Sequence, residues 1–197
     1  MPNTKAKVLV VDDEPLIRTT MSLVLAGMGY QVRSAEDGFS ALNEMRREMP
    51  DILLTDLNMP EMSGFELLSV VGLRFPAVHK IAMSGAYLGT EVPAGASADA
   101  FYQKGSGMES LLHILEALPH IDRLAHQSSS SAKPLWIHRN GNGSAPETCV
   151  TISCPVCLRS FPQAIDDSDG LVRETDCIHC SSPIQYAIVQ PPDRMSA

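Results

Sequence analysis

Short apolar runs alternate with longer amphipathic segments between residues 5 and 118 of the chain. The runs are rich in β-branched residues, and their length is typical of strands buried on both faces. Five runs are expected to be strands: KVLVV (7–11), YQVRSA (30–35), DILLTD (51–56), KIAMS (80–84) and DAFYQK (99–104). Because helix-like segments separate them, the pattern predicts a doubly wound α/β fold with a five-stranded parallel sheet.

The segments between the runs place apolar residues at helical spacing. The first helix is expected to begin at Pro15 and to end near Gly29, and the second is stopped by Pro50. GFELLSVVGLRF (64–75) is expected to be the third helix and MESLLHILEAL (108–118) the closing one.

The pattern changes after residue 120. QSSSSAKP (127–134) and RNGNGSAPE (139–147) are rich in Ser, Gly, Asn and Pro, as flexible linkers are. CVTIS (149–153) and PIQYAIVQ (183–190) again have the composition of strands. We therefore expect three parts: a domain at 5–120, a flexible linker at 121–147 and a small β unit at 148–190. Such a linker predicts that the two units fold independently, and Trp136 is the one linker residue that could dock them together.

Composition excludes several classes of protein. The chain has 197 residues, 44% of them hydrophobic, and a net charge of −8, values typical of a globular protein with a real core. No apolar run approaches the length of a membrane span, and the N-terminus lacks the apolar stretch of a signal peptide, so we expect a cytoplasmic protein without a membrane partner. No segment is basic enough for general affinity for nucleic acid.

Polar side chains end the predicted strands. Asp12 and Asp13 follow the first strand, Asp56 ends the third, Ser84 the fourth and Lys104 the fifth. Ligands of open parallel sheets bind beyond the carboxyl ends of the strands, so these side chains should meet. Three carboxylates that leave room for water are suited to Mg²⁺, and a lysine and a hydroxyl opposite them could hold a phosphoryl group.

The motifs that contain these residues are VVDDEP (10–15), TDLNMPEMSG (55–64), MSG (83–85) and FYQKG (101–105). Together they resemble the receiver domain of two-component response regulators, over about residues 5–120. The resemblance implies a flavodoxin-like fold. It also implies that Asp56 accepts a phosphoryl group from the phosphohistidine of a sensor histidine kinase or a phosphotransfer protein. The chain would then be a phosphoacceptor rather than an enzyme with a turned-over substrate.

The resemblance also implies roles for the neighbours of Asp56. Asp13 and Asp56 would bind Mg²⁺ directly, with the backbone carbonyl of Asn58, and Asp12 would act through a water. Two further residues, Ser84 and Lys104, would contact the phosphoryl oxygens. Phe101 would be the aromatic residue that turns inward as Ser84 moves.

Two departures from the family concern the output face. AYLGTEVPAGAS (86–97) contains two glycines and Pro93, which are poor helix formers, so the fourth helix should be short or irregular. Gly105 stands where receivers commonly have proline. Partner choice inferred from ordinary receivers is therefore not carried over to this chain.

All five cysteines follow residue 148, and four of them form the pattern C-x₂-C-x₁₉-C-x₂-C. These four are Cys154, Cys157, Cys177 and Cys180. The spacing resembles a zinc ribbon, in which each pair makes a knuckle that directs two thiolates at one Zn²⁺. Rubredoxin-like iron, a redox pair and disulfides are the alternatives, the last disfavoured in a cytoplasmic chain. His179, inside the second knuckle, is expected to be a bystander, with replacement of a cysteine ligand as the alternative, and Cys149 is expected to be a spare thiol.

Three output mechanisms remain open. The ribbon could bind an unknown output protein after phosphorylation of the receiver, it could bind DNA as part of a transcription regulator, or it could sense metal or redox state. Residues 147–197 carry three arginines against seven acidic residues, which argues against nucleic acid as a partner. We expect phosphorelay signalling through protein–protein contacts.

Overall fold

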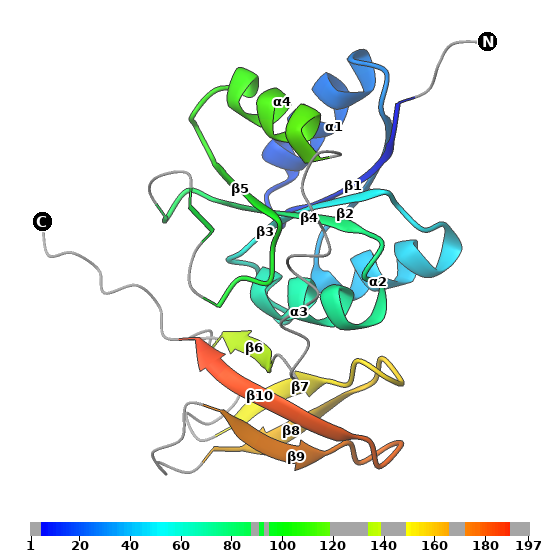
Figure 1. Cartoon of the computed structure of the whole chain (residues 1–197), viewed down its shortest axis with the longest axis vertical. Coiled ribbons are helices and arrows are strands. Elements are labelled where there is room, and N and C mark those ends of the chain that lie inside the picture. Colours follow the sequence, from blue (N-terminus) through cyan, green and yellow to red (C-terminus); the bar gives the residue numbers. More distant parts are fainter. Residues whose placement is uncertain are drawn as a thin grey trace, which may run out of the picture.

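The computed structural model describes residues 5–87, 91–92, 95–118, 134–138, 149–165 and 172–189. Five parallel strands form its main sheet in the order β2-β1-β3-β4-β5 (Figure 1). They are β1 (Lys7–Val11), β2 (Gln31–Ala35), β3 (Ile52–Asp56), β4 (His79–Ser84) and β5 (Ala100–Gln103). The order reverses between β1 and β3, and this reversal places the carboxyl ends of those two strands side by side at a switch point.

Helices cover both faces of the sheet. They are α1 (Pro15–Gly27), α2 (Gly38–Arg47), α3 (Gly64–Arg74) and α4 (Met108–Ala117). α1 and α4 lie on one face, and α2 and α3 lie on the other (Figure 1). α2 and α3 begin at side-chain caps, because Asp37 accepts a hydrogen bond from the Ser40 N–H and Ser63 from the Glu66 N–H. The doubly wound receiver-like fold expected from the sequence is confirmed.

The connection between β4 and β5 has no helix among its described residues, 85–87, 91–92 and 95–99. Residues 88–90 and 93–94 of the expected fourth-helix segment lie outside the described residues, so the expectation of a short or irregular helix there stays a prediction. Gly95 in this segment has a φ of 86°, a conformation that glycine adopts at little cost. The side chains of Tyr87, Val92, Ala96 and Ala98 pack against the core on the α3 side.

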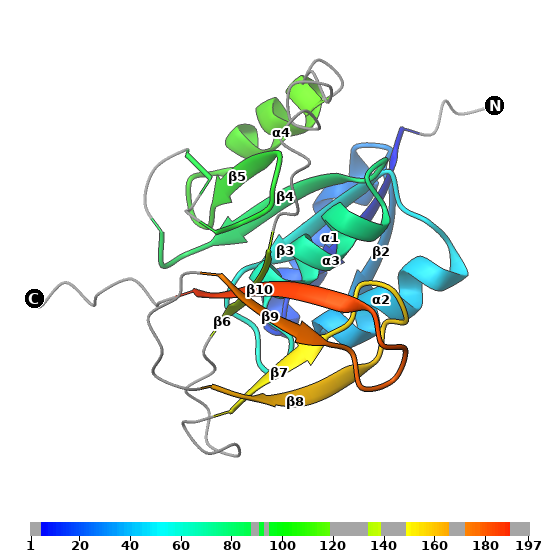
Figure 2. The same cartoon turned by 60° about the horizontal axis from the view of Figure 1, so that its bottom comes forward.

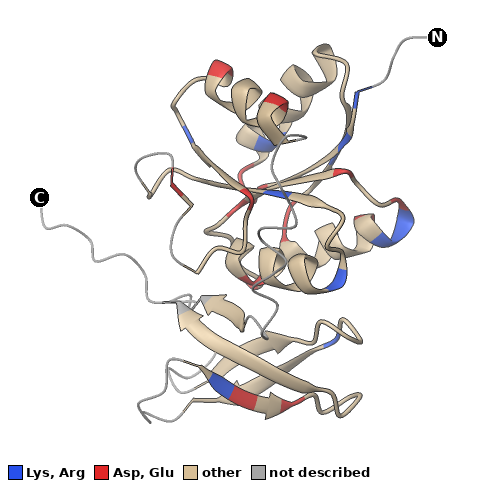
Figure 3. Ribbon diagram, viewed as in Figure 1, with Lys and Arg blue, Asp and Glu red and all other residues tan. Residues whose placement is uncertain are grey.

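The tail contains two small sheets. The strands are β6 (Leu135–His138), β7 (Cys149–Ser153), β8 (Ser160–Ala164), β9 (Arg173–Asp176) and β10 (Pro183–Val189). One sheet has the order β6-β10-β9, with β6 parallel and β9 antiparallel to β10. The other pairs β7 with β8 in antiparallel register. Among the described residues of the tail, Arg173, Glu174 and Asp176 all lie on β9, at an edge of the three-stranded sheet (Figure 3).

The tail packs against the α/β domain on the side of α3, as both views show (Figures 1 and 2). Leu135 and Ile137 of β6 are 0% and 2% exposed and belong to the same apolar cluster as Phe65 and Leu68 of α3. The two parts share one apolar cluster, which differs from the few contacts expected between independent units and matches the alternative of a docked tail.

Part of the predicted linker is also ordered. Leu135–His138 lie within 121–147, but they form β6 and pair with β10, since their alternating apolar side chains find a buried face on α3. Pro134 is also described, whereas the rest of the expected linker, 121–133 and 139–147, lies outside the described residues. None of the helices in the described part of the chain is long and apolar enough to cross a membrane.

Candidate functional site

Three carboxylates meet at the carboxyl edge of the main sheet. Asp12 and Asp13 directly follow β1 in the chain, and Asp56 is the last residue of β3. Each offers an oxygen, and these oxygens all lie within 4.8 Å of one another. Asp12 and Asp56 are buried, with 0% and 5% of their surface exposed, whereas Asp13 is exposed. Carboxylates at this distance repel unless cations sit among them.

Lys104 supplies one of these cations. Its Nζ lies 2.7 Å from Asp56 Oδ2 and 2.8 Å from Asp12 Oδ2. Burial raises the pKa of the Asp56 carboxyl, and the hydrogen bond and charge of Lys104 only partly oppose this shift. Burial lowers the pKa of Lys104, but the two carboxylates outweigh burial and leave that pKa raised. The lysine therefore stays charged at neutral pH and bridges the two buried acids.

Ser84 and Asn58 line the other side of Asp56. The Ser84 hydroxyl accepts hydrogen bonds from the Ala86 N–H at 3.1 Å and from Asn58 Nδ2 at 3.2 Å. The Asn58 N–H donates to Asp56 Oδ1 at 3.4 Å. A hydroxyl at the end of β4, a lysine directly after β5 and a carboxylate at the end of β3 thus converge on one edge.

Gly64 fixes the loop that follows Asp56. A Cβ at this position would overlap the carbonyl oxygen of Asp56, so α3 can begin this close to β3 only with glycine there. The Gly64 N–H donates to the Leu57 carbonyl at 3.1 Å and closes the loop. The start of α3 is therefore held directly against the backbone of Asp56.

Phe101 and Gly105 lie on either side of Lys104 in the chain. Phe101 is 3% exposed and packs in the cluster on the α3 side, so its ring points inward in this structure. Gly105 has a φ of 90°, which proline cannot adopt. The departure from the family pattern at Gly105 is thus matched by a different backbone at this turn.

The donor set fits a hard divalent cation. Oxygen ligands, mostly carboxylates, with one exposed member and room for water are what Mg²⁺ requires. The amide of Asn58 is held at the same edge by Ser84. The sequence-predicted residues of this site are all brought together.

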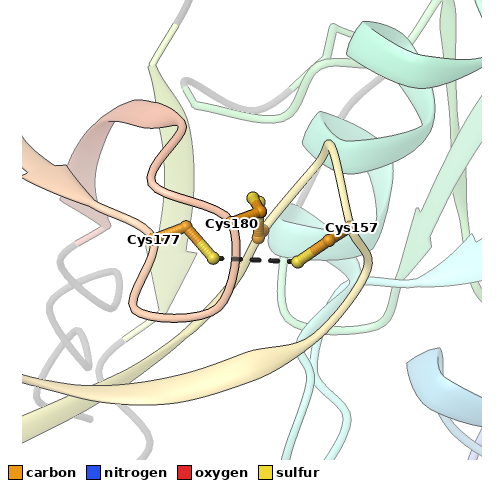
Figure 4. A group of neighbouring side chains, drawn as sticks. Cys157, Cys177 and Cys180 are labelled. Carbon is orange, nitrogen blue, oxygen red and sulfur yellow. Dashed lines mark hydrogen bonds between the residues drawn. The ribbon is translucent and has the colours of Figure 1, made fainter.

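Four cysteines of the tail form a second cluster. The Sγ atoms of Cys154, Cys157, Cys177 and Cys180 all lie within 4.8 Å of one another. Two of the separations, Cys154–Cys180 and Cys157–Cys177, are 3.7 Å. Figure 4 marks the second of them with a dashed line. A tetrahedron with Zn–S bonds of 2.3 Å has edges of about 3.8 Å, whereas a disulfide needs about 2.05 Å. The geometry therefore fits a metal held by four thiolates.

The two cysteine pairs have the same backbone hydrogen bonds. In the first, the Leu158 N–H donates to the Cys154 carbonyl at 2.8 Å. In the second, the Ser181 N–H donates to the Cys177 carbonyl, also at 2.8 Å. Leu158 and Ser181 both have a φ of 57°. Two knuckles of equal shape thus point four thiols at one centre.

The remaining candidates in the tail lie apart from this centre. His179 Nε2 is 3.2 Å from the Ser160 carbonyl and its ring packs edge-on to Phe161, so the imidazole turns toward β8. Cys149 begins β7 and is not a member of the cysteine cluster.

Sequence reasoning missed two residues of α3. Glu66 and Ser69 are both 3% exposed and form hydrogen bonds to the backbone of the tail. A signal was available, because GFELLSVVGL has apolar residues on every face of the helix, and a helix of that kind is buried all round. One face of α3 packs on the main sheet, so a further sheet or helix had to cover its remaining apolar face.

Comparison with known proteins places the first part of the chain. Residues 8–116 match the response regulator receiver domain model. The sensor histidine kinase RcsC of Salmonella typhimurium is 40% identical over 79 residues, which are 39% of this chain and 8% of RcsC. The probable transcriptional regulatory protein TcrX of Mycobacterium tuberculosis is 32% identical over 113 residues, 56% of this chain and 48% of TcrX. The chain thus spans at most about half of these relatives.

Solved structures agree with this match. The chemotaxis response regulator CheY4 of Vibrio cholerae is 30% identical, with a TM-score of 0.52 over 58% of this chain and 99% of its own. TrrA of Thermotoga maritima, solved with Mg²⁺ and beryllofluoride, is 28% identical, with a TM-score of 0.54 over 58% of this chain and 99% of its own. TrrA has also been solved in complex with the histidine kinase ThkA. By its fold, its acidic edge and the match over residues 8–116, this chain belongs to the response regulator receiver domain family.

Proposed function

We propose that Asp56 accepts a phosphoryl group from the phosphohistidine of a sensor histidine kinase or of a phosphotransfer protein. The observation that carries this proposal is the bridge of Lys104 between Asp56 and Asp12, at 2.7 and 2.8 Å. The Asp56 carboxylate is a nucleophile held beside a fixed positive charge, which can neutralise the incoming phosphoryl oxygens. The complex of TrrA with ThkA supports a kinase as the partner class.

In this transfer the P–N bond of phosphohistidine breaks and a P–O bond to Asp56 forms, while the imidazole keeps the electron pair. Lys104 and the Ser84 hydroxyl contact the phosphoryl oxygens. Asp12, Asp13, Asp56 and the carbonyl of Asn58 would hold Mg²⁺. A bound Mg²⁺ neutralises phosphoryl charge and fixes in-line geometry. The product is a phosphoprotein signal, and water attack on the acyl phosphate ends it.

The four-cysteine cluster is proposed to hold Zn²⁺ and to make the tail a zinc ribbon. The two S–S separations of 3.7 Å support a tetrahedral metal site. Output is proposed to pass through protein–protein contacts of the receiver and the ribbon. The charged strand β9 has one arginine against two acidic residues, which disfavours the phosphate backbone of DNA as its partner.

The test of the phosphoacceptor is Asp56→Asn in acetyl phosphate and Mg²⁺. The wild type should gain one phosphoryl mass, and Asp56→Asn should gain none while it keeps the circular dichroism spectrum of the wild type. Asp176→Asn, at an exposed carboxylate of β9, is the matched control and should label like the wild type. Labelling of the Asp56→Asn chain to the wild-type extent would overturn the assignment.

A further inference from the structure

The four thiols of the cysteine cluster differ in their exposure to solvent. Cys154 and Cys177 are 0% and 2% exposed and belong to the apolar cluster that includes α3. Cys157 is half-buried and packs against that cluster. Cys180 is exposed and is not a member of it. An oxidant that arrives from solvent therefore meets Cys180 first.

The surroundings of Cys180 are polar. The Ser182 hydroxyl oxygen lies 3.3 Å from Cys180 Sγ. The neighbouring His179 is held toward β8, with its Nε2 3.2 Å from the Ser160 carbonyl. Ile178, at the tip of the same knuckle, is 69% exposed. The second knuckle thus presents one of its thiols at the surface with a hydroxyl beside it.

Two close pairs of thiols each join one knuckle to the other. Cys154 Sγ lies 3.7 Å from Cys180 Sγ, and Cys157 Sγ lies 3.7 Å from Cys177 Sγ. The sulfurs of a disulfide are about 2.05 Å apart, so each pair has to approach by about 1.7 Å to form a covalent bond. The geometry therefore favours disulfides between the knuckles over disulfides within one knuckle.

We propose that Cys180 is the site at which a hydroperoxide oxidises this chain, and that the oxidised ribbon holds the disulfides Cys154–Cys180 and Cys157–Cys177 in place of the metal. This inference rests on the proposed function, because it takes the four cysteines as the zinc site. It also goes beyond that function, since the ribbon then receives a chemical input of its own, separate from phosphoryl transfer at Asp56.

The oxidation proceeds in two steps for each disulfide. The Cys180 sulfur attacks one peroxide oxygen, so that an S–O bond forms, the O–O bond breaks, and the hydroxide that leaves takes up a proton. The Cys154 sulfur then attacks the sulfenic sulfur, so that the S–S bond forms, the S–O bond breaks, and a second water leaves. Two thiolates, one hydrogen peroxide and two protons thus give one disulfide and two waters. A second peroxide oxidises Cys157 and Cys177 in the same way.

The disulfides remove the metal ligands but keep the two hairpins together. Metal binding requires deprotonated thiolates, so zinc affinity falls with the first disulfide and is lost with the second. The new bonds join residues 26 and 20 positions apart. They tie the β7–β8 hairpin to the β9–β10 hairpin and constrain the unfolded chain, as the metal did. The oxidised ribbon therefore keeps its strands, and a dithiol reductant restores the four thiols.

The test is a titration of the zinc-loaded full chain with hydrogen peroxide in the presence of a chromogenic zinc indicator. One zinc ion per chain should be released as two peroxide molecules per chain are consumed. Peptide mapping without reductant should find the disulfides Cys154–Cys180 and Cys157–Cys177. The circular dichroism spectrum should be retained, and a dithiol reductant with Zn²⁺ should restore the zinc-loaded chain.

Trapping and variants identify the sulfur that reacts first and the pairing that follows. With less than one peroxide per chain and dimedone, which traps sulfenic acids, most of the adduct should lie on Cys180. In the metal-free chains, Cys180→Ser should form only the Cys157–Cys177 disulfide, and Cys177→Ser only the Cys154–Cys180 disulfide. Cys149→Ser removes a thiol outside the cluster, so it should match the wild type in zinc release and in disulfides.

The outcomes separate this inference from the proposed function. Zinc that stays bound after two peroxides per chain, a first adduct mostly on another cysteine, or disulfides inside the knuckles would overturn the inference and leave the zinc site in place. A reduced chain that binds no zinc overturns the proposed zinc site and this inference with it. The measurements with peroxide do not depend on the assignment of Asp56 as the phosphoacceptor.

Discussion

Replacing Glu66 by glutamine should remove the pH dependence that this residue gives to the stability of the chain. The Glu66 carboxyl is buried against β7, and its pKa rises from 4.5 to about 7 because burial disfavours the charged form. Hydrogen bonds from Ser153 oppose this shift but do not cancel it. Glutamine keeps the shape and an acceptor for the Ser153 N–H, and it carries no charge at any pH.

The direction of this pH dependence follows from proton linkage. The unfolded chain releases the Glu66 proton near pH 4.5, whereas the folded chain keeps it until about pH 7. Between these values the folded state binds more protons, so stability falls as pH rises through this window and levels off above it. At about 1.4 kcal/mol per pKa unit, the loss between pH 5 and pH 8 is about 2 to 3 kcal/mol.

The assay is urea unfolding of the zinc-loaded full chain at pH 5, 6, 7 and 8, for the wild type and Glu66→Gln in parallel. Acid also weakens thiolate–metal bonds, but this effect is common to both proteins and cancels in the difference. Glu66→Gln should gain stability over the wild type as pH rises, and Glu109→Gln, at an exposed site, should not. Stability curves of wild type and Glu66→Gln that stay parallel from pH 5 to pH 8 would refute the burial argument.

Three further changes test the two candidate sites. Gly64→Ala should lower the free energy of unfolding in urea by about 3 kcal/mol, because the new Cβ meets the Asp56 carbonyl. Gly27→Ala, with open space around it, should be neutral or stabilising. Equal stability of the two variants would contradict the close approach of Gly64 to Asp56. Lys104→Met should slow labelling by acetyl phosphate but keep Mg²⁺ binding, measured by calorimetry, since the lysine is not a metal ligand. Labelling at the wild-type rate would contradict the proposed contact of Lys104 with the phosphoryl group. Cys154→Ser should abolish zinc binding, measured by native mass spectrometry, and increase amide exchange in both the tail and α3, because they share a core. Cys149→Ser should have neither effect. Slow amide exchange in α3 of the Cys154→Ser chain would contradict the shared core.

The sequence alone predicts the main sheet closely. The expected strand 7–11 is the observed β1, and DILLTD differs from β3 by its first residue. These segments are predictable because their burial on both faces demands short β-branched runs, which is a local property. The convergence of Asp12, Asp56, Ser84 and Lys104 is predictable for the same reason, since a parallel sheet brings all strand ends to one edge.

The cysteine cluster is equally local. Two C-x₂-C pairs fold into knuckles through hydrogen bonds between near neighbours, as the matched bonds of Leu158 and Ser181 show. That the four thiols meet follows from their spacing and from the pairing of the strands on either side of each knuckle.

The docking of the tail was decided only by the tertiary structure. LWIH (135–138) is four residues long and lies in a segment whose composition is that of a linker, so no local pattern distinguishes it as a strand. Glu66 occupies the first turn of α3, where acidic residues are ordinarily explained by the helix dipole. Its function as an acceptor for Ser153 depends on a residue 87 positions away. Local patterns set which segments become strands and helices, whereas contacts between distant segments depend on which buried faces remain uncovered once those elements have packed.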